Sequence, residues 1–96
     1  MITYREAVGS VLKDERLAQN RTLRDVSESS FTALGYLSEV ERGQKEASSE
    51  VVAQLARALN LEAGEVVIRA GLRMLSDGVP DTVEELLDKQ ERLAVR

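Results

Sequence analysis

The stretch Leu23 to Gly43, which reads LRDVSESSFTALGYLSEVERG, decides the fold of this 96-residue chain. Its pattern predicts two short helices, about residues 23–30 and about residues 33–42, separated by a tight connection. Thr22 and Asp25 have the spacing of a capping box, in which a hydroxyl and a carboxylate satisfy free N–H groups of the first turn. Three serines near the end of the first helix compete for backbone hydrogen bonds and favour a turn.

The second predicted helix has two unlike sides and ends at Gly43, a residue that readily takes the left-handed conformation of a helix end. At about 100° per residue, one side carries Ala33, Leu34, Leu37, Val40 and Glu41. The other side carries Gly35, Ser38, Glu39 and Arg42. A helix pair with an apolar inner face and an exposed outer face is typical of a helix-turn-helix, although many other helical domains contain such pairs.

Helical spacing of apolar residues extends over the rest of the chain. It predicts helices over about residues 4–18, 49–59 and 62–75, and a last one that begins with a capping box at Thr82, after the break Asp77-Gly78-Val79-Pro80. In the helix over 62–75, a packed face is expected from Val66, Val67, Ala70 and Met74. No stretch alternates as a strand does. We therefore expect an all-α fold, with five helices in residues 1–75 and a C-terminal helix in residues 76–96.

The composition excludes several classes of function. The chain has no cysteine and no histidine, which removes disulfides, thiolate chemistry, the commonest metal ligand and the commonest general base. We expect no enzyme activity, no metal, no cofactor and no small-molecule ligand. The short apolar runs and the N-terminus, which has no signal-peptide pattern, predict a cytoplasmic protein without a membrane partner.

The charge distribution bears on nucleic-acid binding. A net charge of −4 argues against indiscriminate binding to phosphates. Residues 1–45 hold 7 basic and 7 acidic side chains, so the excess acid lies entirely in residues 46–96. The neutral half can therefore present a local basic face from Arg21, Arg24, Arg42 and Lys45.

The quoted stretch, followed by EVVAQLARALNLEAGEV, resembles the XRE or Cro/repressor-like helix-turn-helix family, and the resemblance covers about Tyr4 to Val67. The run TALGYLSEVERGQKEASSEV is most similar to actinobacterial regulators of Clp protease genes. The family prefers alanine at Ser27, glycine at Phe31 and a small aliphatic residue at Thr32. We therefore expect Phe31 to pack over the helix pair rather than to take a glycine-like conformation.

The resemblance implies that the N-terminal part of the helix over 33–42 enters the major groove of DNA. The base-facing residues would then be Leu34, Gly35, Ser38 and Glu39. Arg42 would donate to guanine or to a phosphate. The residues expected to contact the DNA backbone are Arg24, Tyr36 and Lys45. The resemblance also implies a structural ion pair between Arg16 and Glu41.

Each of these assignments has an alternative without DNA. Leu34 could belong to the core, and Tyr36 could simply be half-buried with its hydroxyl at the surface. Glu39 and Arg42, three residues apart on one helix, could pair with each other. Lys45 could be solvated with or without DNA.

The apolar stripe of the C-terminal helix needs a surface to cover it. It could fold back on its own domain, but we favour a dimer interface, because paired recognition helices read a palindrome when they lie roughly 34 Å apart. The residues expected at this interface are Met74, Val83, Leu86, Leu87 and Leu93.

The sequence thus predicts a transcription regulator that binds a palindromic operator in double-stranded DNA as a homodimer. The resemblance further implies an activator of Clp protease and stress genes, with RNA polymerase as a candidate partner. The alternative function is an antitoxin or protein-interaction module with a secondary DNA-binding role.

Overall fold

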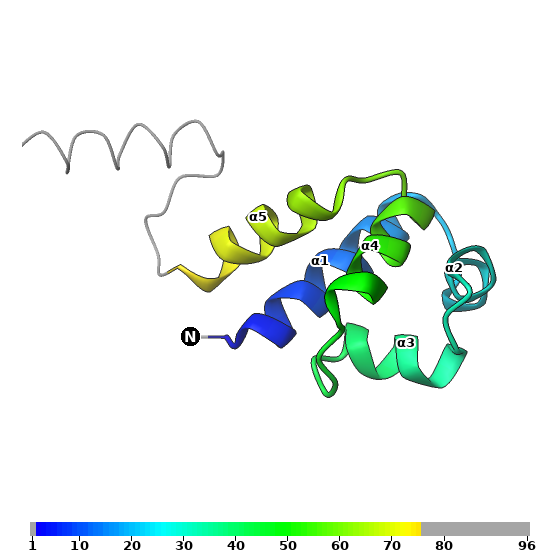
Figure 1. Ribbon diagram of the computed structural model, residues 1–96, viewed down its shortest axis with the longest axis horizontal. Coiled ribbons are helices and arrows are strands. Elements are labelled where there is room, and N and C mark those ends of the chain that lie inside the picture. The colour runs from blue at the N-terminus through cyan, green and yellow to red at the C-terminus, as the bar shows by residue number, and fades with distance from the viewer. Residues whose placement is uncertain (1, 76–96) are drawn as a thin grey trace, which may run out of the picture.

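The computed structural model describes residues 2–75, which form five α-helices and contain no strand (Figure 1). The helices are α1 (Tyr4–Ala18), α2 (Leu23–Ser30), α3 (Leu34–Glu41), α4 (Ser49–Ala58) and α5 (Ala63–Met74). The all-α prediction is therefore confirmed for these residues. The predicted C-terminal helix, and with it Val83, Leu86, Leu87 and Leu93, lies outside the described residues.

Side chains just before three of the helices fix where those helices begin. The hydroxyl of Thr22 accepts from the backbone N–H of Asp25 at 3.0 Å, and the carboxylate of Asp25 accepts from the N–H of Thr22 at 2.9 Å. The same capping box joins Thr3 and Glu6 at the start of α1. At α4, the hydroxyl of Ser48 accepts from a backbone N–H of the first turn. These contacts satisfy N–H groups that a helix leaves free.

One hydrophobic core lies between the helices. Helix α1 packs against α3 and α5, while α4 packs against α2 and α5. The largest side chains that are almost completely buried are Leu12, Leu37, Leu55, Leu59, Val11, Val26, Val40 and Val66. Since α2 and α3 both contribute to this core and also contact each other, packing within the domain helps to fix their relative orientation.

A glycine lets α1 approach the end of α3 closely. A Cβ at Gly9 would lie 2.1 Å from the carbonyl oxygen of Val40, closer than any side chain could fit. Gly43, whose φ is +73°, lies against Glu6 of α1, where a Cβ would come within 2.7 Å of the Glu6 Cγ. Both contacts fix the C-terminal end of α3 against α1.

The expectation for Phe31 is wrong. Its φ and ψ are 56° and 36°, the left-handed region that glycine favours, and its side chain is 92% exposed instead of packed over the helix pair. The short turn is the physical reason. Phe31 N–H donates to the Glu28 carbonyl at 3.3 Å and Thr32 N–H to the Ser27 carbonyl at 3.1 Å, a pattern that requires a left-handed residue at the end of α2.

The packed face expected on α5 is only partly correct. Val66 and Ala70 are buried, but Val67, one step of about 100° around the helix, is 45% exposed. Met74 is partly buried against the core, as expected for the packed face, and its place at a dimer interface stays a prediction. None of the described helices is both long and apolar enough to span a membrane.

Candidate nucleic-acid interface

Helices α2 and α3 are joined by the short turn Phe31-Thr32-Ala33. The hydroxyl of Ser27 donates to the Thr32 carbonyl at 2.5 Å, and the buried hydroxyl of Thr32 donates to the Ser30 carbonyl at 3.3 Å. These bonds satisfy polar groups of the turn within the turn itself. The connection between the two helices is therefore held by its own side chains, although it lacks the glycine and aliphatic residue that the family prefers.

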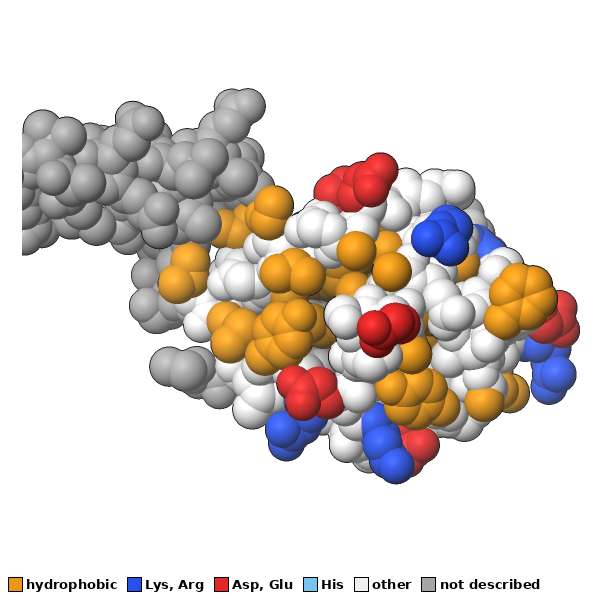
Figure 2. Space-filling model, viewed as in Figure 1, with side chains coloured by type: hydrophobic (Ala, Val, Ile, Leu, Met, Phe, Trp, Pro, Cys, Tyr) orange, Lys and Arg blue, Asp and Glu red, His pale blue; other side chains and the backbone are white. Residues whose placement is uncertain are grey.

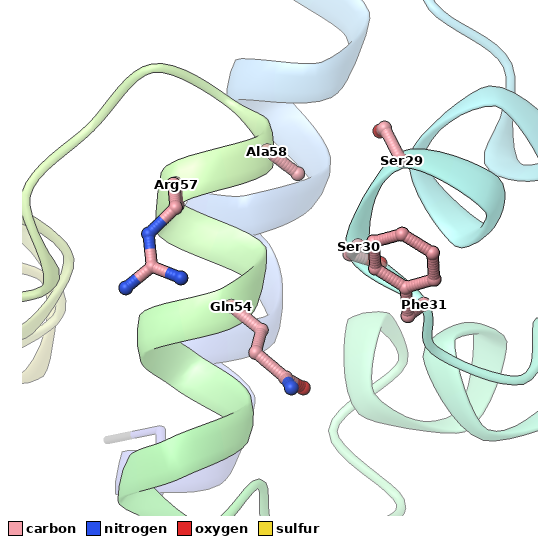
Figure 3. Close-up of a pocket in the computed structure, with 6 residues that line it drawn as sticks. All are labelled: Ser29, Ser30, Phe31, Gln54, Arg57 and Ala58. Carbon is pink, nitrogen blue, oxygen red and sulfur yellow. The ribbon is translucent and has the colours of Figure 1, made fainter.

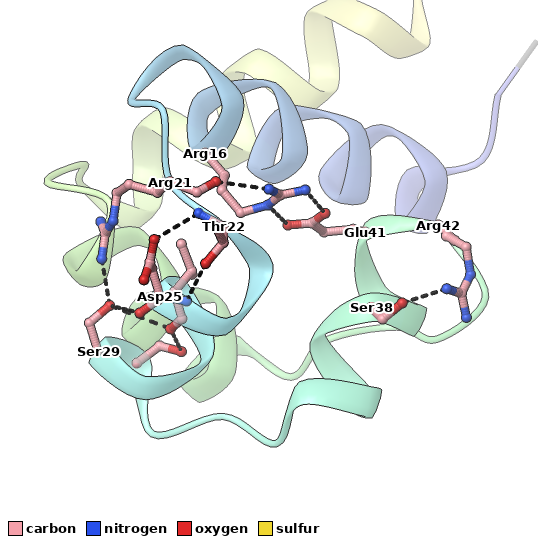
Figure 4. Close-up of polar contacts among 10 residues, drawn as sticks. Arg16, Arg21, Thr22, Asp25, Ser29, Ser38, Glu41 and Arg42 are labelled. Atoms are coloured by element: carbon pink, nitrogen blue, oxygen red, sulfur yellow. Dashed lines mark hydrogen bonds and ion pairs between the residues drawn. The ribbon is translucent and has the colours of Figure 1, made fainter.

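The inner face of α3 is anchored by an ion pair between Arg16 of α1 and Glu41. The guanidinium donates twice to the carboxylate, from Nε to Oε2 at 2.8 Å and from Nη2 to Oε1 at 3.0 Å (Figure 4). Arg16 Nη1 also donates to the Arg21 carbonyl at 2.9 Å. The hydrogen bonds that Arg16 donates to the Glu41 carboxylate hold the pKa of Arg16 above its ordinary value. The pair thus connects α1, the α1–α2 loop and α3.

The N-terminal part of α3 presents an open outer surface. Leu34 is 37% exposed, so it is only partly available to the core. A Cβ at Gly35 would meet no atom within 4 Å, which leaves free space over the backbone there. Ala33 makes no side-chain hydrogen bond to the first turn of α3. Another molecule can therefore approach the backbone of this turn closely.

Ser38, Arg42 and Gln44 form a small polar network at the other end of this surface. Arg42 Nη1 donates to the Ser38 hydroxyl (Figure 4), and Nη2 donates to Gln44 Oε1 at 3.2 Å. The alternative pairing of Arg42 with Glu39 is not among the ion pairs of residues 2–75. Glu39 itself is half-buried.

The three residues expected at the DNA backbone differ in their surroundings. Arg24 and Lys45 are exposed, and Tyr36 is half-buried and packs against the core. The Tyr36 hydroxyl donates to the Glu46 carbonyl at 3.3 Å, which positions its oxygen at the α3–α4 loop. Tyr36 thus contributes to the packing of the domain, which agrees with the alternative that it is half-buried with its hydroxyl at the surface.

Two further polar residues at this surface were missed by the sequence analysis. Arg5 Nε donates to the Gly43 carbonyl at 3.0 Å, which brings a cation of α1 beside the α3–α4 loop. Gln44 bonds Arg42, as described above. Arg5 and Gly43 are 38 residues apart, and no local spacing signals such a contact. Gln44 follows a helix end and could have been included on position alone.

The described residues offer no other evident chemistry. Within residues 2–75, no group of three or more histidine, cysteine, aspartate or glutamate side chains is arranged to hold a metal ion. Helix α3 follows the short helix α2 after a tight turn. It has a buried inner face, an open N-terminal turn and cations at its end. These features define the helix-turn-helix class of protein.

Comparison with known proteins leads to the same class. Residues 12–66 match the helix-turn-helix family, and the chain belongs to that family. The chain is 54% identical over 70 residues to the transcriptional regulator ClgR of Mycobacterium tuberculosis (strain ATCC 25618 / H37Rv). That match covers 73% of this chain and 62% of the relative, so the chain matches less than two thirds of the relative's length.

Two crystal structures of the clp gene regulator ClgR from Corynebacterium glutamicum are also similar. One has a TM-score of 0.73 and 41% identity, and the match covers 78% of this chain and 97% of that one. The other has a TM-score of 0.72 and 39% identity, with 97% of this chain and 88% of that one covered. At these identities the likeness extends beyond the fold to the sequence.

Proposed function

We propose that this protein is a sequence-specific transcription regulator that binds double-stranded DNA through the outer face of α3. The observation that carries the proposal is the division of α3 into two faces. Leu37, Val40 and Glu41 are buried and tie the helix to the domain, while the opposite face stays open. A helix held in this way can lie in a major groove without any loss of core packing.

Each residue of the open face matches a chemical group of the groove. Leu34 can contact a thymine methyl, Glu39 can accept from cytosine N4, and Arg42 can donate to guanine. Gly35 lets the backbone come close to the base edges, and Ser38 can reach a base edge or a phosphate. The backbone contacts, which set the register, come from Arg5, Arg24, Tyr36 and Lys45.

In this proposal, the protein binds DNA as a homodimer. Val67 and Ile68 of α5 are 45% and 43% exposed, Leu75 directly after α5 is 46% exposed, and Tyr4 of α1 is 38% exposed. Figure 2 shows hydrophobic side chains gathered between α5 and the start of α1. A hollow of about 290 Å³, lined in part by Tyr4 and Val67, lies in the same region. A second copy covering this face, with the help of Val83, Leu86, Leu87 and Leu93, would bury it.

The target genes follow from the relatives. Because the similar proteins carry the names transcriptional regulator and clp gene regulator, we propose that this protein activates Clp protease and related stress genes. Activation would take place at a palindromic operator, through a contact with RNA polymerase. This role rests on similarity, whereas the DNA-binding role also rests on the geometry of α3.

Selection from randomised duplex DNA tests the DNA-binding role. The purified full-length protein is used to enrich duplexes over several rounds, and affinity is then measured by fluorescence anisotropy over a salt series. We expect an enriched palindrome with a binding constant that falls steeply with salt. No enrichment together with no salt-dependent binding would contradict the proposal.

Variants identify the contacts. Glu39→Ala should relax the preference at one base position by about fivefold or more, since one good base contact is worth roughly 1–3 kcal/mol. Arg42→Ala should lower affinity and relax the preference for guanine at one position, since one good base contact is worth roughly 1–3 kcal/mol. Arg69→Ala is the matched control, because Arg69 pairs with Glu15 and Glu65 on a different surface. It removes the same charge and should leave the base preference unchanged.

Light scattering tests the dimer. Replacing Leu86 and Leu87 with aspartate should give monomers, because two carboxylates cannot be buried unpaired in an apolar interface. Ile68→Asp should have the same effect if α5 belongs to the interface. Leu17→Asp, at a 51% exposed position of α1, controls for the change in surface charge. An unchanged dimer in the Leu86 and Leu87 variant would show that another surface holds the two copies together.

A further inference from the structure

Phe31 is an exposed aromatic residue in an unfavourable backbone conformation. Its side chain is 92% exposed, so the ring buries almost nothing within residues 2–75. Its φ of 56° lies in the left-handed region, where a side chain is disfavoured and glycine is not. Neither property stabilises the domain. The exposed ring is therefore available for a contact outside the domain.

A hollow lies directly beside the ring. Its volume is about 210 Å³, and it separates the end of α2 from α4 (Figure 3). Phe31 borders it on one side, and Arg57 and Gln54 of α4 border it on the other (Figure 3). The remaining lining residues are Ser29, Ser30 and Ala58. The Phe31 ring of the turn and the Gln54 amide of α4 thus face one space with room for a partner's side chain, and the Arg57 guanidinium lies at its edge, on the side of α4 away from the ring (Figure 3).

The charge of the hollow is positive. Arg57 is the only charged residue among the described residues that line it. Arg21 reaches the same place, where it donates to the Ser29 hydroxyl at 2.7 Å and to the Ala58 carbonyl at 2.5 Å. Neither arginine takes part in an ion pair among residues 2–75. The complementary partner is therefore a segment with an apolar side chain next to a carboxylate.

The hollow lies apart from the proposed DNA contacts. None of the residues assigned to DNA is among its described lining residues, which come from the end of α2, from Phe31 of the turn and from α4, not from α3. A partner can therefore occupy the hollow while α3 is in the groove. A DNA-bound protein that raises transcription must contact the enzyme that transcribes the gene, which is RNA polymerase.

We propose that the Phe31 hollow is the contact through which the DNA-bound protein engages an acidic segment of RNA polymerase. The apolar side chain of that segment packs on the Phe31 ring, and its carboxylate pairs with Arg57. This inference rests on the proposed function, because it requires that the protein binds an operator and activates transcription. It adds the surface that carries activation and the chemistry of the partner.

Transcription with purified RNA polymerase holoenzyme tests the inference. The operator obtained by selection is placed upstream of a weak promoter at a series of spacings, and operator affinity is measured for each variant in parallel. Phe31→Ala removes the ring and keeps the backbone strain, whereas Phe31→Gly removes both. Arg57→Glu reverses the charge of the hollow. Leu17→Ala is the control, since it removes an exposed apolar side chain that does not line the hollow.

We expect the operator affinity of both Phe31 variants to stay within about twofold of the affinity of the unaltered protein. Their activation of transcription should fall at least about fivefold, as for a residue at the centre of an interface. Arg57→Glu should lose activation similarly, and Leu17→Ala should keep it. Because Phe31→Gly relieves strain, its thermal midpoint should not fall, and lost activation cannot then be ascribed to unfolding.

The remaining outcomes separate this inference from the proposed function. Full activation by the Phe31 variants would overturn the inference and leave the proposed function intact. A parallel loss of operator affinity in Phe31→Ala would mean that the ring contacts DNA, which also overturns it. An unaltered protein that binds the operator without raising transcription at any spacing would overturn both activation and the inference. An unaltered protein that binds no DNA would overturn the proposed function itself.

Discussion

The backbone of Gly9 touches the end of α3, since a Cβ on Gly9 would lie 2.1 Å from the carbonyl oxygen of Val40. Gly9→Ala must push α1 and α3 apart. We expect the free energy of unfolding to fall by about 2 kcal/mol or more, as for other overpacked cores. The measurement is urea unfolding followed by circular dichroism.

Gly71→Ala on α5 is the matched control for Gly9→Ala. A Cβ at Gly71 would meet nothing within 4 Å, so the same substitution should raise the free energy of unfolding by about 0.5–1 kcal/mol through helix propensity. Equal effects at Gly9 and Gly71 would contradict the close approach of α1 and α3.

The Arg16–Glu41 pair predicts a second large effect on stability. Their side chains are 11% and 5% exposed, so Glu41→Gln leaves a guanidinium charge without its carboxylate in a largely buried place. We expect a loss of about 3 kcal/mol in the free energy of unfolding. Glu65→Gln, which breaks an exposed contact of 3.7 Å with Arg69, should cost less than about 1 kcal/mol. Similar losses in the two variants would show that burial of the pair is unimportant.

Gly35→Ala should separate stability from DNA binding. The added methyl group meets no atom of the protein, and alanine favours a helix over glycine, so stability should stay the same or rise by up to about 1 kcal/mol. If Gly35 faces the bases, the methyl group lies between the helix and the groove, and operator affinity should fall about tenfold, for a contact worth roughly 1–3 kcal/mol. Chemical denaturation and anisotropy on one protein sample measure both. Unchanged affinity would place Gly35 away from the groove.

The capping boxes predict how stability changes with pH. Hydrogen bonding by the Thr22 backbone N–H, reinforced by the Thr22 hydroxyl, lowers the pKa of Asp25 below its ordinary value. Thr3 lowers the pKa of Glu6 in the same way. A lowered pKa in the folded state means that the stabilisation is complete above the unfolded values, about 3.9 for Asp and 4.3 for Glu. It is lost as the pH falls through the folded values.

Asp25→Asn isolates one of these carboxylates. The difference in the free energy of unfolding between the unaltered protein and Asp25→Asn should be constant above about pH 5 and should shrink as Asp25 becomes protonated in acid. Urea denaturation at a series of pH values gives this difference directly. A difference that stays constant down to pH values well below about 3.9 would mean that the charge of Asp25 does not contribute to the cap.

Local signals in the sequence predicted the helices well. The capping pair Thr22 and Asp25, the left-handed Gly43 and the helical spacing of apolar residues each act within one or two turns of the chain. The ranges inferred from them, such as 4–18 and 23–30, coincide with α1 and α2. Such signals are local because caps and periodicity depend on backbone groups a few residues apart.

Contacts between distant residues were harder to predict. Nothing near Gly9 signals that α3 crosses over it, and Arg5 reaches Gly43 from 38 residues away. Phe31 failed for another reason: its side-chain type suggested packing, but the hydrogen bonds of the turn determined the backbone conformation and left the ring exposed. The base-facing residues were assigned as a group from the resemblance to the family. The residues alone could not show whether Leu34 contacts a base or belongs to the core.

The two faces of α3 carry different constraints. The inner face depends on Gly9, Arg16 and Glu41, which fix how the helix sits, and the outer residues Gly35, Ser38 and Glu39 make little contribution to that arrangement. Over evolution, descendants of this domain could therefore change the outer residues and acquire new operators one substitution at a time, with the fold intact at every step. Drift in the preferred operator should then be common among related proteins, while replacements at the α1–α3 contact should be rare.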